Sequence, residues 1–175
     1  MKLAAVHAPE PGATNRLLAD LADRAMARGL RLCGTVQTNT PLEGTHHCDM
    51  DVMVLPAGPV LRISQSLGRA SRGCRLNPHV LETAVRQTQQ RLVQGADLLI
   101  VNKFGKHEAE GRGFREVIAE ALAADIPVLV GLNGLNEAAF DAFSDGLGVR
   151  LAPTRAALYD WIDAIAVTPK LVRAI

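Results

Sequence analysis

With 175 residues and a mass of 18.7 kDa, the chain is long enough to form one domain with a substantial core. A net charge of +1 excludes a strongly basic protein, and an aromatic content of 3% leaves few side chains on which the bases of single-stranded nucleic acid could stack. We therefore expect no nucleic-acid partner. No apolar run reaches the length of a membrane span, no signal peptide opens the sequence, and three cysteines lie at scattered spacings, which together predict a cytoplasmic protein without membrane insertion.

The apolar segments and the turn residues between them predict strands and helices that alternate along the chain. This alternation predicts an α/β fold of three layers, in which helices flank a mostly parallel sheet, and a single domain over residues 1–175. Residues 48–65 predict an inserted β-hairpin. The expected strands cover residues 2–6, 30–37, 48–55, 59–65, 96–101, 127–131 and 148–151, and the expected helices cover residues 15–28, 78–94, 114–124, 136–144 and 154–167.

The loop after the first strand has the setting of a phosphate-binding P-loop, which joins a buried strand to the N-terminus of a helix. When residues 7–14 are aligned with the pattern G-x-x-x-x-G-K-[ST], the second glycine (Gly12) and the hydroxyl (Thr14) are kept. His7 replaces the first glycine and Ala13 replaces the lysine. The sequence therefore predicts the frame of a nucleotide site without its main positive charge.

Polar side chains gather where the predicted parallel strands end, which is the edge at which such sheets bind ligands. A purely structural sheet does not need them, so we expect a small anionic ligand, held by the N–H groups of residues 11–15 and by nearby cations. In the structural alternative, Lys106 pairs with Glu108 or Glu110 and Arg16 is solvated. The residues expected to bind the anion or nucleotide are His7, Gly12, Ala13, Thr14, Asn15, Arg16, Gln37, Asn39, Asn102, Lys103, Lys106 and Asn133.

Five motifs resemble those of the DUF2478 family, which is itself similar to bacterial P-loop nucleoside triphosphatases. They are G-A-T-N-R-L-L at 12–18, V-Q-T-N-T at 36–40, C-D-M-D at 48–51, R-G-C-R-L at 72–76 and N-K-F-G-K-H-E-A-E-G-R-G-F-R at 102–115. Members of that family are often encoded beside molybdate-uptake genes. The resemblance therefore implies a cytosolic, degenerate P-loop relative linked to molybdenum handling, with molybdate-transport or molybdoenzyme-maturation proteins as partners.

The departures from the triphosphatase pattern bear on catalysis. Ala13 stands in place of the lysine, and Asn102 stands where a carboxylate would hold Mg²⁺. Because stabilisation of charge on the transferring phosphoryl group is usually the largest catalytic term, we expect no efficient hydrolysis. The leading interpretation is an accessory protein that binds a nucleotide, with or without Mg²⁺, or an oxyanion such as molybdate. The alternative is a weak ATP- or GTP-hydrolysing enzyme that uses Lys103 or Lys106 for charge and Glu108 as a base or metal ligand.

A second candidate site contains thiol and imidazole groups. His46, His47, Cys48 and the distant Cys74 are ligands that suit a soft or borderline metal ion, but no C-x-x-C or H-x-x-x-H spacing accompanies them. Surface histidines beside a partly buried cysteine are the structural alternative. The arginines that flank Cys74 would lower its thiol pKa, and the same loop could instead cover the bound anion.

Two further expectations concern packing and assembly. Cys33 lies inside an apolar strand, where a small buried hydrophobic residue is the simplest interpretation. The hairpin at 48–65 provides a sheet edge through which a homodimer could form.

Overall fold

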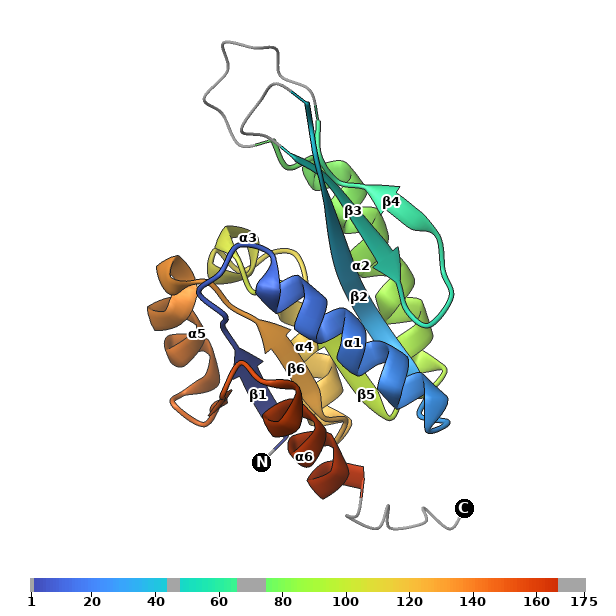
Figure 1. The fold of residues 1–175 in the computed structure, drawn as a ribbon. Coiled ribbons are helices and arrows are strands. Elements are labelled where there is room, and N and C mark those ends of the chain that lie inside the picture. The colour runs from blue at the N-terminus through green and yellow to red at the C-terminus, as the bar shows by residue number, and fades with distance from the viewer. Residues whose placement is uncertain (1, 44–47, 66–74, 167–175) are drawn as a thin grey trace.

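The computed structural model describes residues 2–43, 48–65 and 75–166, and in this part of the chain a seven-stranded sheet lies between two layers of helices (Figure 1). The expected three-layer α/β fold is confirmed. The strands are β1 (Leu3–Val6), β2 (Leu32–Pro41), β3 (Cys48–Val54), β4 (Val60–Arg62), β5 (Leu98–Val101), β6 (Val128–Gly131) and β7 (Val149–Leu151). The helices are α1 (Ala13–Ala27), α2 (Pro78–Val93), α3 (Lys106–Ala109), α4 (Arg115–Ala123), the 3₁₀ turn η1 (Gly134–Asn136), α5 (Glu137–Ser144) and α6 (Arg155–Ala166).

The strands follow the order β4-β3-β2-β5-β6-β1-β7 across the sheet. Neighbouring strands from β2 to β7 run parallel, whereas β3 pairs antiparallel with both β2 and β4. The expected mostly parallel sheet with one inserted hairpin is therefore confirmed. Short apolar strands such as β5 suit the sheet centre, because helices cover both of their faces.

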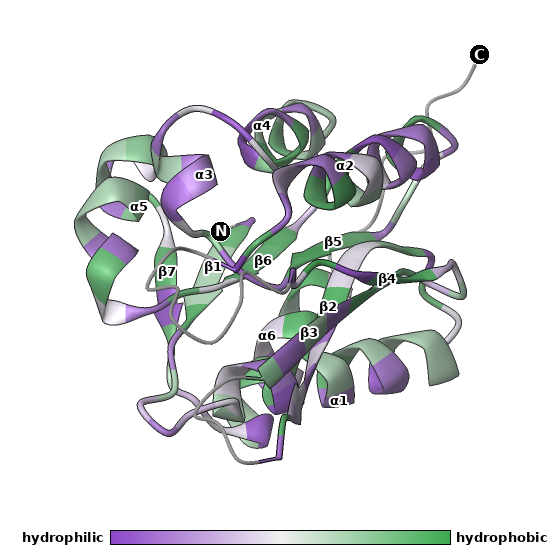
Figure 2. Cartoon of the chain, turned by 90° about the horizontal axis from the view of Figure 1, so that it is seen from above, coloured by the Kyte–Doolittle hydropathy of each residue, from purple (hydrophilic) through white to green (hydrophobic). Residues whose placement is uncertain are grey.

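Two hydrophobic cores fill the space between the sheet and its two helix layers. Helices α1 and α6 cover one face, and α2, α4 and α5 cover the other (Figure 2). The cores are mainly aliphatic, although the ring of Phe104 meets that of Phe140 edge-on at 5.4 Å. Asn77 caps α2 by accepting the N–H groups of His79 and Val80, and the Thr154 hydroxyl accepts the N–H of Ala157 at the start of α6.

Strand β2 is longer than the sequence indicates. It continues to Pro41, beyond the expected end at residue 37, and it pairs with β3 from Thr35↔Val54 to Pro41↔Cys48. The expectation was wrong because this half of β2 is exposed and polar, and hydrogen bonding to β3 rather than apolar burial keeps it extended.

Gly34 marks the point where β2 leaves the parallel sheet. Its φ is +111°, and a Cβ built on it would lie 1.8 Å from the carbonyl oxygen of Ile100. Only glycine allows strands β2 and β5 to approach this closely.

The loop after β5 contains a short helix that the sequence did not indicate. Helix α3 covers Lys106–Ala109, in a segment that we expected to be irregular, because four residues are too few to show a helical periodicity. Conversely, β4 ends at Arg62, before the expected boundary at 65.

The connections from β1 and β6 define a position at the carboxyl edge of the sheet, here called the crevice. These strands are neighbours, yet α1 follows β1 onto one face and α5 follows β6 onto the opposite face. In open α/β sheets, ligands bind where neighbouring strands send their helices to opposite faces, beyond the carboxyl ends of the strands. The β1–α1 loop, η1 and the β5–α3 loop all lie at this edge (Figure 1).

Candidate functional site

The β1–α1 loop is closed by its own hydrogen bonds. The N–H of Ala8 donates to the Thr14 hydroxyl at 3.0 Å, and the N–H of Ala13 donates to the carbonyl of Glu10 at 3.0 Å. Gly12 takes a φ of +75° immediately before α1, a backbone conformation that favours glycine. The loop therefore enters the helix through a tight turn that leaves its tip, residues 9–11, exposed.

The first turn of α1 supplies free donors at the crevice. Helix geometry leaves the first N–H groups of a helix without acceptors inside the helix. The N–H of Arg16 reaches the carbonyl of Gly12, whereas the N–H groups of Thr14 and Asn15 have no acceptor among the described residues. Since Pro9 and Pro11 carry no N–H, the start of the helix rather than the tip of the loop supplies the backbone donors for an anion.

Two side-chain cations at this edge have no ion-pair partner in the described part of the chain. Arg16 is exposed and folds back over the loop, so that its Nη1 lies 3.2 Å from where a Cβ on Gly12 would be. Lys103 follows β5 and is also exposed, with its aliphatic carbons beside Gly105. Lys106 differs, because its ammonium lies 3.6 Å from Glu110, the pairing that the structural alternative anticipated.

Asn102 connects three elements at the centre of the site and is only 5% exposed. Its Oδ1 accepts the N–H of Gln37 on β2 at 3.0 Å, and its Nδ2 donates to the side-chain oxygen of Asn15 on α1 at 3.0 Å. The same Nδ2 lies 3.5 Å from Oε1 of Gln37, whose own amide donates to Asn39 at 2.7 Å. The structure thus brings together four carboxamides from the expected site.

Glu108 is buried and organises the loop between β5 and α4. One carboxylate oxygen accepts the N–H of Gly105 at 2.8 Å and the other accepts the N–H of Phe114 at 3.0 Å. The side chain is 4% exposed, so neither oxygen faces the crevice. This geometry argues against Glu108 as a general base or metal ligand and gives it a structural role.

His7 and Glu137 form a pair across the crevice. Nδ1 of His7 lies 3.1 Å from Oε1 of Glu137, at the start of α5. Glu137 was not among the residues expected at the site, because 130 residues separate it from His7 in the sequence. The signal that pointed to it was its position as an acidic residue at the start of the helix after β6. Asn133 lies nearby on the same loop and accepts a hydrogen bond from the side chain of Asn136 at 2.7 Å.

The family described as "Protein of unknown function (DUF2478)" matches residues 3–161. The chain belongs to the DUF2478 family. Among curated proteins, it is 34% identical over 145 residues to the molybdenum import ATP-binding protein ModC 2 of Bradyrhizobium diazoefficiens. The match covers 83% of this chain but 16% of that relative, so the chain spans about a sixth of its length.

A solved structure shares the fold of this DUF2478 chain. It is the solution structure of a human cancer-related nucleoside triphosphatase, with a TM-score of 0.65 at 15% identity over 97% of this chain and all of that one. At this identity the likeness concerns the fold alone, and it agrees with the expected three-layer α/β architecture.

The second candidate site of this DUF2478 chain is only partly described. His46, His47 and Cys74 lie outside the described residues, and Cys48 is partly buried. The neighbouring Asp49 is held by Arg62 at 2.6 Å and by the Ser64 hydroxyl at 3.1 Å. Within the described ranges, no group of three or more His, Cys, Asp or Glu side chains could hold a metal ion.

Cys33 is fully buried, as expected. Burial raises the pKa of its thiol to about 12, which keeps the thiol protonated and unreactive at neutral pH.

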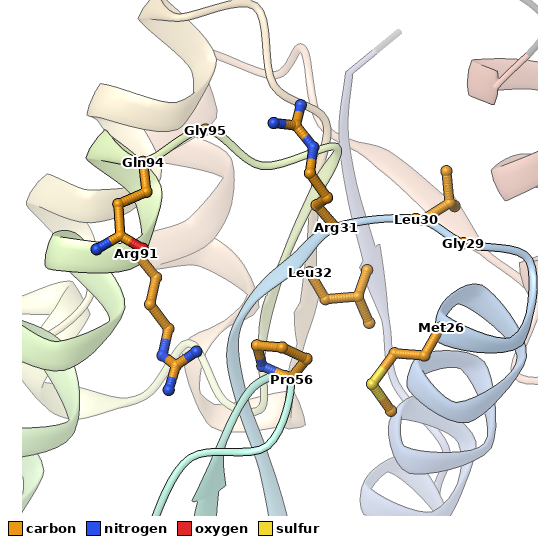
Figure 3. A pocket seen from close by; sticks show the side chains of 9 residues that line it. All are labelled: Met26, Gly29, Leu30, Arg31, Leu32, Pro56, Arg91, Gln94 and Gly95. Carbon is orange, nitrogen blue, oxygen red and sulfur yellow. The ribbon is translucent and has the colours of Figure 1, made fainter.

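A hollow of about 510 Å³ lies at the other end of the sheet (Figure 3). Its lining includes Met26 near the end of α1, Leu32 at the start of β2, and Arg91 near the end of α2. It is therefore remote from the carboxyl edge and contains none of the expected site residues.

No helix among residues 2–43, 48–65 and 75–166 is long and apolar enough to cross a bilayer.

Proposed function

We propose that this protein binds an anion, either the phosphates of a nucleotide or an oxyanion such as molybdate, at the carboxyl edge between β1 and β6. One observation carries the proposal: at the carboxyl edge of the sheet, the start of α1 has N–H groups without acceptors, and Arg16 and Lys103 have no ion-pair partner, among the residues that the structure describes. A helix N-terminus already favours an anion by about 0.3–1 kcal/mol, and neighbouring cations add to this.

The binding is proposed to occur without efficient hydrolysis. Ala13 provides no charge where a P-loop lysine would neutralise the transferring phosphoryl group. The weak-triphosphatase alternative needs a base or metal ligand, and Glu108, its candidate, is buried with both oxygens bound to backbone N–H groups. The structure therefore favours the binding interpretation over the enzymatic one.

The biological setting is proposed to be molybdenum metabolism. The basis is the similarity to one part of a molybdenum import ATP-binding protein. We propose an accessory role in the cytoplasm, with proteins of molybdate transport or molybdoenzyme maturation as partners. A second copy of the chain could pair along β4, an edge strand with an exposed valine, Val60.

Calorimetric titration with ATP, GTP and molybdate, together with a phosphate-release assay, tests the proposal. We expect saturable binding of at least one of these anions and no phosphate release above the rate in buffer. Absence of binding for all three would overturn the proposal. Phosphate release that Lys106→Ala abolishes would establish the enzymatic alternative instead.

A further inference from the structure

P-loop nucleoside triphosphatases hold their substrate together with Mg²⁺, so the fold raises the question of whether this site fits the cation. Mg²⁺ requires oxygen ligands at about 2.0–2.1 Å in octahedral geometry, usually one or two carboxylates besides phosphates and water. In this class the protein ligands are the hydroxyl of the P-loop and an acidic residue at the end of a neighbouring strand. The corresponding positions here are Thr14 and Asn102.

Asn102 presents a donor where the cation would need an acceptor. The N–H of Gln37 requires an oxygen opposite it, which fixes Oδ1 of Asn102 on that side. The amino group must then point the other way, toward the side-chain oxygens of Asn15 and Gln37. Because the side chain is 5% exposed and bonded on both sides, it has little freedom to turn its oxygen to a cation.

Three other oxygen-bearing side chains at this edge, those of Thr14, Glu108 and Glu137, are also engaged. The Thr14 hydroxyl accepts the N–H of Ala8, and the carboxylate of Glu108 is enclosed by two backbone N–H groups. Glu137 is bound to His7 at 3.1 Å. The two positions that would hold Mg²⁺ in this fold therefore do not fit the cation, and the exposed carboxylate of Glu10 lies at the tip of the loop rather than at either of them.

We infer that this site binds an unchelated oxyanion without a divalent cation, and that Asn102 is the residue that makes the site independent of the metal. The inference rests on the proposed function and specifies its ligand class. The free polyanion exposes its full charge to Arg16, Lys103 and the first-turn N–H groups of α1. Mg²⁺ on the anion would cancel part of that charge and compete with the protein for the same oxygens.

Substitution of Asn102 by aspartate reverses this electrostatic arrangement. Asn102→Asp places a buried negative charge beside the anion site with the same side-chain volume. The free anion is then repelled, and a cation between the carboxylate and the anion relieves the repulsion. Whether anion binding depends on Mg²⁺ is therefore determined by whether residue 102 carries an amide nitrogen or a second carboxylate oxygen.

The experiment measures binding of ATP, GTP and molybdate by calorimetry at constant ionic strength, once with EDTA and once with excess Mg²⁺. For the unsubstituted chain, we expect Mg²⁺ to weaken ATP binding by about threefold or more and to leave molybdate binding unchanged. For Asn102→Asp, we expect ATP binding in EDTA to weaken by about tenfold and Mg²⁺ to restore it. Gln90→Glu, which adds the same charge on an exposed position of α2, is the control and should behave like the unsubstituted chain.

The outcomes separate the two proposals. ATP or molybdate binding by the unsubstituted chain that requires Mg²⁺ would overturn this inference and leave the proposed function standing. Failure of ATP, GTP and molybdate alike to bind in either buffer would overturn the proposed function and this inference with it. The comparison with and without Mg²⁺ in the unsubstituted chain needs no variant, so it decides the question even if Asn102→Asp does not fold.

Discussion

At the scale of single residues, the proposed anion binding depends on two cations that have no ion-pair partner in the described ranges, Arg16 and Lys103. Removing both, in the variant Arg16→Ala/Lys103→Ala, should weaken binding of ATP or molybdate about five- to thirtyfold, because exposed charge contacts contribute up to about 1 kcal/mol each. Arg86→Ala on α2 removes one exposed arginine away from the crevice and should leave the affinity unchanged. Calorimetric titration measures all three affinities, and equal values would show that these cations do not contact the ligand.

Another residue-scale consequence follows from Cys33. Its folded-state pKa is about 12, against an ordinary value of 9.0, so the thiol is protonated in both folded and unfolded chains below pH 9. Above pH 9 the unfolded chain ionises first, and stability falls as pH rises toward 12, by up to about 1.4 kcal/mol per pH unit. Urea unfolding at pH 8, 9 and 10 should therefore show the unsubstituted chain losing stability faster than Cys33→Ala, which lacks the thiol. Parallel losses in the two proteins would contradict the assignment.

At the scale of elements, the segment from Asn102 to Phe114 is held by one buried carboxylate. Glu108→Ala leaves the N–H groups of Gly105 and Phe114 buried without acceptors, at a cost of about 1–3 kcal/mol each. We therefore expect a loss of about 2–5 kcal/mol in the free energy of unfolding, measured with urea. Glu110→Gln, on an exposed neighbour, should change stability by no more than about 0.5 kcal/mol. A small effect of Glu108→Ala would mean that this loop does not depend on its carboxylate.

Element boundaries were predictable where burial alone determines them. Strand β5 and helix α2 follow from an apolar run and from an Asn-Pro cap, both of which are local features of the sequence. The exposed half of β2 was not predictable, because its extended conformation comes from pairing with β3. The partners of Asn102 were equally hidden, since Asn15 and Gln37 lie 87 and 65 residues away along the chain. The sequence could name these amides as candidates but not their hydrogen bonds.

At the scale of the whole molecule, the fold offers two different ends to a ligand. The carboxyl edge has the N-terminus of α1, whose first N–H groups lack acceptors among the described residues, whereas the hollow at the opposite end, although lined by Arg31 and Arg91, lies beside the C-terminal ends of α1 and α2. The carbonyl ends of helices carry partial negative charge and disfavour an anion. The N-terminus of α1 and the carboxyl ends of the parallel strands lie at the same edge of the sheet. Both features therefore favour anion binding at that edge.

Hydrogen exchange over the whole chain tests this assignment. With saturating ATP or molybdate, we expect slower exchange at residues 12–16 and 102–106, because the amides of Thr14 and Asn15 gain an acceptor when the anion is bound. Residues 26–32 and 91–95, which line the hollow, serve as the internal control and should exchange at the same rate with and without ligand. Protection confined to those control segments would place the ligand at the opposite end of the sheet, because protection of an amide requires a new hydrogen bond or local exclusion of water.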